Sequence, residues 1–161
     1  MRHLLLFLGI VFSFVFVSVA QEIAPVHKHP VFDAKRDAAK DIQNALVLAK
    51  QTNKRVLLDV GGNWCVWCHL LDSLFVANRD LDEYLFQHYV VVKINVSPEN
   101  KNENVLANYP KIKGYPHLFV LDENGKVLKS QDTGVLENKK GKPKGHDKDK
   151  VFAFLKKWAK E

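Results

Sequence analysis

The chain has 161 residues, a hydrophobic fraction of 47% and a formal net charge of +6. Its length and composition fit one compact domain with an extra terminal segment. Much of the positive charge lies between residues 139 and 150, where no aromatic residue interrupts the lysines. Nucleic-acid-binding surfaces combine basic side chains with interleaved aromatics on a defined face, so this pattern argues against a nucleic-acid partner. We expect the stretch to be a solvated loop.

The first twenty residues predict an export signal. Two basic residues precede an apolar run over residues 4–17, and Ser18-Val19-Ala20 supplies the small residues of a cleavage site. A membrane span needs about 20 consecutive apolar residues, so this shorter run favours a cleaved signal over a retained anchor. We therefore expect a periplasmic or secreted mature protein. The expected organisation is a signal peptide over 1–20, an extended lead-in over 21–33 and a folded domain over 34–161.

The domain begins with a helical pattern followed by a strand pattern. Two prolines make residues 21–32 an extended lead-in that could add one edge strand. From Asp33 to Asn53, apolar residues recur three and four positions apart, which predicts an amphipathic helix with Asp33 as its N-cap. Residues 56–60 form a short apolar run with one acid, which is typical of a strand buried on both faces.

The later elements follow the same two periodicities. They are, in order, helices to about Ala77 and over 81–88, a buried strand over 89–96, a weakly helical segment over 99–109, strands over 117–121 and 127–130, and a final helix with its inner face from Val151 to Trp158. Asn124-Gly125 lies between the last two strands and predicts a tight hairpin turn. This order predicts an α/β sheet with a parallel core and an antiparallel hairpin at one side.

The two cysteines of the chain, Cys65 and Cys68, form a C-x-x-C pattern that follows the 56–60 strand and opens a helix. A disulfide that encloses two residues constrains little of the unfolded chain, so a chemical role explains the pair better than a structural one. Unpaired N–H groups and the helix dipole stabilise a thiolate at a helix N-terminus. We expect Cys65 to attack, and Cys68, one turn further, to resolve the mixed disulfide.

The segment Trp64-Cys65-Val66-Trp67-Cys68-His69 resembles the active site of the thioredoxin superfamily, particularly of secreted bacterial thioredoxin-like proteins with a W-C-x-x-C centre. Three more features match in order and spacing. Asp59 stands where the family keeps a buried acid, and Lys93 stands where a lysine approaches that acid. Gly114-Tyr115-Pro116 stands where the family has its cis-proline loop. The resemblance implies a thioredoxin fold, with a central mixed sheet flanked by helices, and a thiol-disulfide oxidoreductase.

Physical arguments attach roles to these residues. A carboxylate on an apolar strand is costly unless it is paired or functional. Desolvation would raise the pKa of Asp59 and make it a proton acceptor for Cys68, while the alternative is a structural acid paired with Lys93. The resemblance implies that the backbone of Tyr115, beside Pro116, pairs with an extended substrate segment as an added strand.

The remaining candidates surround the cysteines. Trp64 is expected to pack beside Cys65 and shape the substrate surface, and the alternative is a tryptophan of the core. Trp67 departs from the resemblance, because thioredoxins proper have proline at that position. His69 and His117 would tune the Cys65 thiolate if their rings lie near the sulfurs, and are otherwise ordinary histidines. Because the motif matches neither the strong oxidants nor cytosolic thioredoxin, we infer a reductase or isomerase role.

Three functions remain open from the sequence. An enzyme would act on protein thiols and disulfides through the Cys65–Cys68 disulfide, without another cofactor, and exchange electrons with a second dithiol protein, for which a membrane-embedded relay is a reasonable candidate. A metal-binding module would need His69 and His117 as further ligands, and a second C-x-x-C is absent, so no metal is expected. A non-catalytic adaptor would bind through the cis-proline loop or the lysine-rich loop, but the intact cysteines and Asp59 argue against it.

Overall fold

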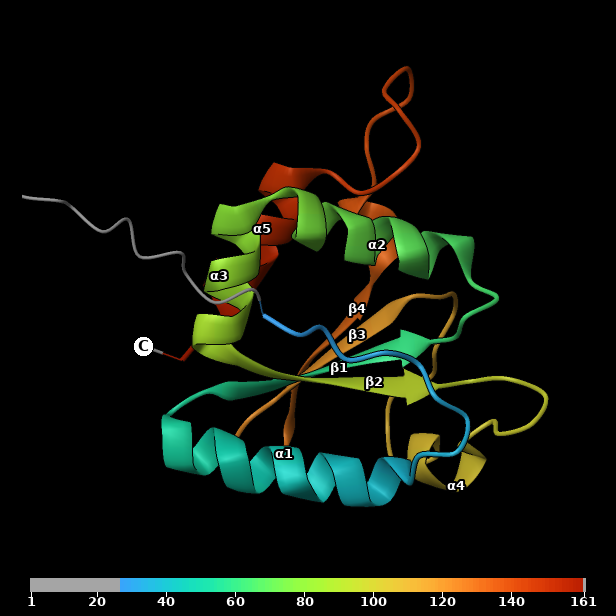
Figure 1. Cartoon of the computed structure of the whole chain (residues 1–161), viewed down its shortest axis with the longest axis vertical. Helices are drawn as coiled ribbons and strands as arrows, with labels where there is room; N and C mark the ends of the chain where they lie inside the picture. Colours follow the sequence, from blue (N-terminus) through green and yellow to red (C-terminus); the bar gives the residue numbers. More distant parts are fainter. Residues whose placement is uncertain (1–26, 161) are drawn as a thin grey trace, which may run out of the picture.

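The computed structural model describes residues 27–160 of the chain. The expected signal peptide and the start of the lead-in lie outside these residues. The elements are, in order, α1 (Ala38–Thr52), β1 (Arg55–Gly61), α2 (Val66–Ala77), α3 (Arg79–His88), β2 (Tyr89–Asn95), α4 (Glu103–Leu106), β3 (His117–Leu121), β4 (Val127–Asp132), the 3-10 helix η1 (Thr133–Leu136) and α5 (Lys148–Trp158) (Figure 1). None of the described helices is long and apolar enough to span a bilayer.

In the part of the chain that the structure describes, four strands form one mixed sheet in the order β2-β1-β3-β4. β2 runs parallel to β1, whereas β3 runs antiparallel to both β1 and β4. Helices α1 and α4 cover one face of the sheet, and α2, α3 and α5 cover the other (Figure 1). The mixed sheet between helices, which the resemblance implied, is confirmed. Among the described residues, its parallel part is the pair β1–β2.

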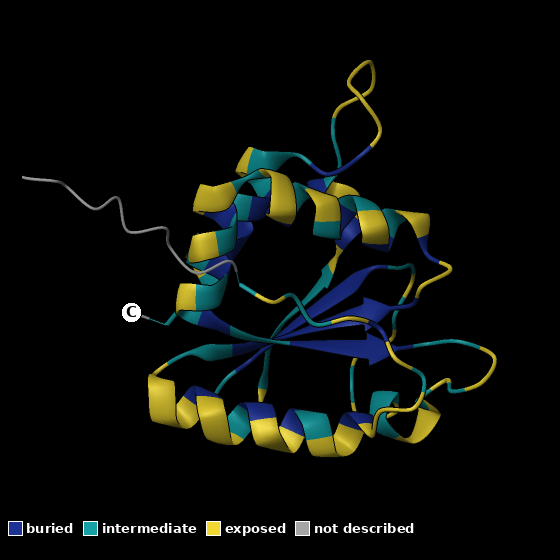
Figure 2. Ribbon diagram, viewed as in Figure 1, coloured by how far each residue is buried: buried dark blue, intermediate teal, exposed yellow. Residues whose placement is uncertain are grey.

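The sheet is buried on both faces because successive side chains of a strand point to opposite sides. In β1, Val56, Leu58 and Val60 pack under α1, while Leu57 packs into the core below α2, α3 and α5. Figure 2 shows the central strands as the most buried part of the molecule. Asp59 alternates with Leu58 and Val60, so its carboxylate lies on the α2 side of the sheet.

One prediction about the start of the domain is wrong. The N-cap of α1 is Asp37, whose side chain accepts the Lys40 N–H at 3.1 Å. Asp33 instead accepts the Lys35 N–H at 2.9 Å in a turn, since a short acidic side chain can satisfy a turn as readily as a helix end. The predicted edge strand is not found in the described part of the lead-in, from His27 onward, and the rest of that prediction lies outside the described residues.

Candidate active site

The chain places Cys65 at the N-terminus of α2. β1 ends at Gly61, three residues follow, and Cys65 is the N-cap, with its Sγ accepting the Cys68 N–H at 3.1 Å. Cys65 and Cys68 are joined by a disulfide, with their Cα atoms 5.2 Å apart. When this disulfide is reduced, the unpaired N–H groups and the positive end of the helix dipole favour a thiolate on Cys65.

The two sulfurs differ in their access to solvent. Cys65 retains 4% exposure and Cys68 none, and both pack against Phe32, with Trp67 and Tyr115 at the margin of this cluster. A Cβ at Gly61 would collide with the Cys68 Sγ, so the glycine that ends β1 leaves the space that this sulfur occupies. An incoming group can therefore reach only Cys65.

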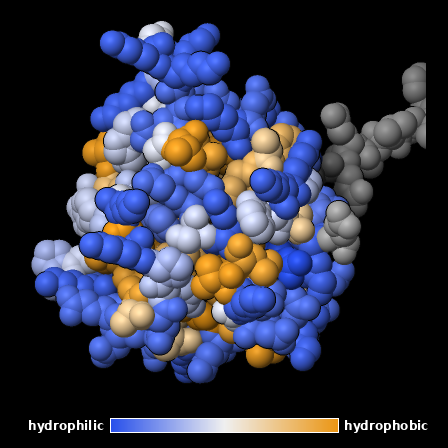
Figure 3. All heavy atoms as spheres, turned by 180° about the vertical axis from the view of Figure 1, so that it is seen from behind, coloured by the Kyte–Doolittle hydropathy of each residue, from blue (hydrophilic) through white to orange (hydrophobic). Residues whose placement is uncertain are grey.

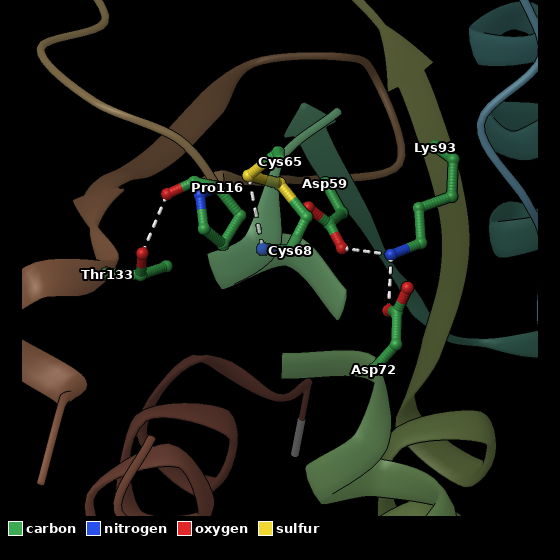
Figure 4. A network of polar contacts seen from close by, with 7 residues as sticks. All are labelled: Asp59, Cys65, Cys68, Asp72, Lys93, Pro116 and Thr133. Atoms are coloured by element: carbon green, nitrogen blue, oxygen red, sulfur yellow. Dashed lines mark hydrogen bonds and ion pairs between the residues drawn. A yellow bond between two sulfur atoms is a disulfide. The ribbon is translucent and has the colours of Figure 1, made fainter. Parts of the chain in front are cut away.

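A buried ion network lies beside the disulfide (Figure 4). Lys93 Nζ donates to Asp59 Oδ2 at 2.6 Å and to Asp72 Oδ1 at 2.5 Å. The side chains of Lys93 and Asp59 are 4% and 6% exposed, whereas that of Asp72 is 33% exposed. Asp59 and Lys93 meet because they are register partners across β1 and β2. Asp72 was missed from the sequence, although its position four residues after Cys68 on a helix places it on the same helical face.

Burial decides the protonation of this network. Desolvation raises the pKa of Asp59, and the opposing effect of Lys93 does not outweigh it. Burial acts to lower the pKa of Lys93, but the two carboxylates overcome it and the net shift is upward. Asp59 Oδ1 is buried without a hydrogen-bond partner among the described residues, and Asp59 shares its sheet face with Gly61, against which the Cys68 sulfur lies. This oxygen can therefore accept a proton on the Cys68 side of the network.

The loop before β3 lies on the other side of the disulfide. The Tyr115–Pro116 peptide bond is cis, and the Pro116 carbonyl accepts a hydrogen bond from Thr133 Oγ1 of η1 at 2.7 Å. Figure 4 shows Pro116 beside Cys65. The exposed ring of Trp64 meets the Tyr115 ring edge-on, with centroids 5.6 Å apart. Trp64 and Tyr115 thus flank the entrance to the Cys65 sulfur.

The two candidate histidines hydrogen-bond to groups other than the sulfurs. His69 Nε2 lies 2.8 Å from the Asn63 carbonyl oxygen, and His117 Nε2 lies 2.8 Å from Ser130 Oγ. Burial lowers the pKa of His117, which keeps its ring neutral. That these histidines tune the Cys65 thiolate stays a prediction.

Residues 27–160 contain no group of three or more histidine, cysteine or acidic side chains arranged to hold a metal ion, so the metal-module alternative has no ligand set in this part of the chain.

Comparison with known proteins gives a consistent picture. The family model of the thioredoxin-like domain matches residues 42–141. The thiol:disulfide interchange protein DsbD of Actinobacillus pleuropneumoniae is 27% identical over 115 residues, which are 71% of this chain and 19% of that protein. DsbD of Campylobacter jejuni is 34% identical over 87 residues, which are 53% of this chain and 15% of that protein. The chain thus spans no more than about a fifth of the length of these DsbD relatives.

Solved structures extend the likeness over most of the domain. A disulphide isomerase from Xylella fastidiosa has 30% sequence identity and a TM-score of 0.65, with 78% of this chain and 94% of that chain covered. The oxidised C-terminal domain of Neisseria meningitidis DsbD has 19% identity and a TM-score of 0.54, with 80% and 99% covered. At that lower identity the second structure supports the fold alone.

Proposed function

Because this chain belongs to the thioredoxin-like family and is a thiol-disulfide oxidoreductase, we propose that it reduces or rearranges disulfides of exported proteins, with Cys65 attacking and Cys68 resolving. The observation that carries this proposal is the disulfide at the N-terminus of α2, with Cys65 slightly exposed and Cys68 sealed. That asymmetry gives the two sulfurs different tasks, because a substrate sulfur can approach one of them only.

The exchange proceeds in two balanced steps. The Cys65 thiolate attacks one sulfur of a substrate disulfide, forms a mixed disulfide and releases one substrate thiolate. Cys68 passes its proton to Asp59, attacks the Cys65 sulfur and releases the second substrate thiolate. The Cys65–Cys68 disulfide forms, the substrate gains two electrons and the protein loses two. In isomerisation, the released substrate thiolate attacks another substrate disulfide before Cys68 acts.

Surrounding residues prepare this chemistry. Trp64 and Tyr115 frame the approach to Cys65, and the backbone of Tyr115 pairs with an extended substrate segment next to Pro116. No organic cofactor takes part, and a second dithiol protein returns the electron pair to Cys65–Cys68. The predicted signal peptide favours a periplasmic location, where a membrane-embedded dithiol protein is a suitable donor.

A trapping experiment tests the proposal. Cys68→Ala should accumulate a mixed disulfide between Cys65 and a substrate protein such as insulin, because the resolving thiol is absent. Cys65→Ala is the matched control and should form no adduct, since the remaining Cys68 is sealed from solvent. Adducts would be counted by non-reducing electrophoresis and mass spectrometry. Equal adduct formation by both variants, or reduction of insulin by Cys65→Ala, would refute the assigned order of attack.

A further inference from the structure

Residues 138–145, between η1 and α5, form an ordered protrusion that we name the lysine hairpin. Asn138 N–H donates to the Gly145 carbonyl at 2.9 Å and Asn138 Nδ2 donates to the Pro143 carbonyl at 2.9 Å. An isolated β-bridge between Glu137 and His146 closes its base. The hairpin projects from the α2 and α5 side of the molecule (Figure 1), and Figure 3 shows a hydrophilic protrusion at the same end.

The hairpin is attached to the active site through Trp67. His146, at its base, is 4% exposed and meets the Trp67 ring edge-on, with centroids 5.7 Å apart. Lys144 Nζ lies 5.2 Å from the centre of the same ring. Trp67 stands between the two cysteines in sequence and packs against their cluster. The hairpin therefore has a fixed position next to the disulfide.

The opposite end of the same segment is also held at the site. η1 precedes the hairpin, and its Thr133 hydroxyl donates to the Pro116 carbonyl of the cis-proline loop. After the hairpin, Asp147 caps α5 by accepting the N–H groups of Asp149 and Lys150. These anchors hold the segments on both sides of the hairpin, and the Trp67 contacts hold its base beside that ring.

The hairpin carries unneutralised positive charge. Its four lysines are all exposed, and none of them forms an ion pair within residues 27–160; they are Lys139, Lys140, Lys142 and Lys144. The hairpin itself contains no acidic residue. Four like charges on an ordered protrusion favour an anionic partner and speed its approach.

On the basis of the proposed function, we propose that the lysine hairpin docks an acidic surface of the partner protein that exchanges its disulfide with Cys65. Whatever the hairpin binds is held beside Trp67 and thus beside the reacting sulfur, which favours a protein that carries its own disulfide over a membrane. The hairpin has no aromatic side chain on which nucleic-acid bases could stack. An acidic patch near the partner's cysteines would thus set how fast the two proteins react.

Two synthetic peptides test this inference in the full protein. Both contain the same intramolecular disulfide, one flanked by four glutamates and the other by four glutamines. The reduced protein should react about tenfold faster with the acidic peptide at 10 mM salt, and this ratio should approach one at 0.5 M salt because the charges are screened. In K139Q/K140Q/K142Q, which keeps Lys144 on Trp67, the ratio at low salt should fall below about threefold.

A matched variant separates local docking from net charge. K40Q/K50Q/K126Q removes the same charge from exposed lysines of α1 and the β3–β4 turn, and it should retain the wild-type ratio. Equal ratios in the two triple variants, or a wild-type ratio near one, would overturn the docking proposal and leave the proposed function intact. Failure of the wild-type protein to reduce the glutamine peptide would overturn the proposed function itself. Hairpin-dependent binding to phosphatidylglycerol vesicles with an unchanged peptide ratio would show a membrane anchor and overturn the proposal.

Discussion

Removal of the buried cation tests the ion network most directly. Lys93→Met keeps the aliphatic stem but leaves Asp59 and Asp72 without their shared partner. Removing one member of a buried ion pair typically costs about 3–5 kcal/mol, because the remaining charge is left uncompensated. Asp72 is one third exposed and can turn to water, so the loss should arise mainly from Asp59, which cannot. We expect the free energy of unfolding of the oxidised protein to fall by about 3–5 kcal/mol at pH 7.

The loss should depend on pH in a defined direction. Without Lys93, the pKa of folded Asp59 rises further above its unfolded value of about 3.9. Below the unfolded pKa the carboxyl group is protonated in both states, so the raised pKa costs no stability there. Above the unfolded pKa the folded state loses stability, and this loss grows until the pH reaches the folded pKa. The stability gap between Lys93→Met and the wild type should therefore narrow as the pH falls from 7 toward 4.

Urea unfolding at pH 7 and pH 4 measures both effects. Lys54→Met is a suitable control, since within residues 27–160 Lys54 Nζ bonds only to the neutral Phe86 carbonyl, at 2.6 Å. The loss of stability in this control should be small and independent of pH. Combining Lys93→Met with Asp59→Asn should cost less than the sum of the single changes, because the pair is already broken. A Lys93→Met loss below about 1 kcal/mol, or one equal at the two pH values, would contradict the reasoning.

Two further changes probe the packing around the disulfide. Burial lowers the pKa of His146 to about 4, so the neutral ring is favoured in the folded state and stability is lost as the pH falls from about 6.5 toward 4, by up to about 3 kcal/mol. His146→Phe should reduce this pH dependence in urea unfolding, and an unchanged dependence would refute the assignment. Gly61→Ala should destabilise the oxidised protein by about 1–3 kcal/mol through the collision with Cys68. Gly114→Ala, whose Cβ would meet nothing within 4 Å, should be close to neutral; equal losses would contradict the steric argument.

The sequence predicts the helices and strands well where burial of one or both faces gives a regular spacing of apolar residues. The run 56–60 reads as a strand because both faces of β1 are covered, and α2 follows from its apolar stripe. Local cues were weaker at the start of α1, where Asp33 and Asp37 are chemically equal candidates for the cap. Which of the two aspartates caps the helix depends on where the extended lead-in ends, and that is set by how the lead-in packs on the rest of the domain.

The sequence predicts the buried pair of the site but not its half-exposed third member. Resemblance placed Asp59 and Lys93 at the right positions, and their pairing follows from the register of β1 and β2. Asp72 belongs to the same network, but a single acid on a half-exposed helical face looks like an ordinary surface residue until the lysine beneath it is seen. The lysine hairpin was expected to be a solvated loop, and its tip is solvated, while its base packs on Trp67 through His146.

Because the disulfide is almost completely buried, the rate at which Cys65 reacts depends on how a partner protein binds. Since Cys65 retains only 4% exposure, a partner sulfur must enter between the surrounding aromatic rings in one orientation, and few random encounters meet that condition. A charged element fixed beside the entrance raises the fraction of encounters that are correctly oriented without changing the sulfur chemistry. Substitutions at Asp59 or Cys68 should therefore alter the rate with every substrate, whereas substitutions in the hairpin should alter the rate according to the partner's charge.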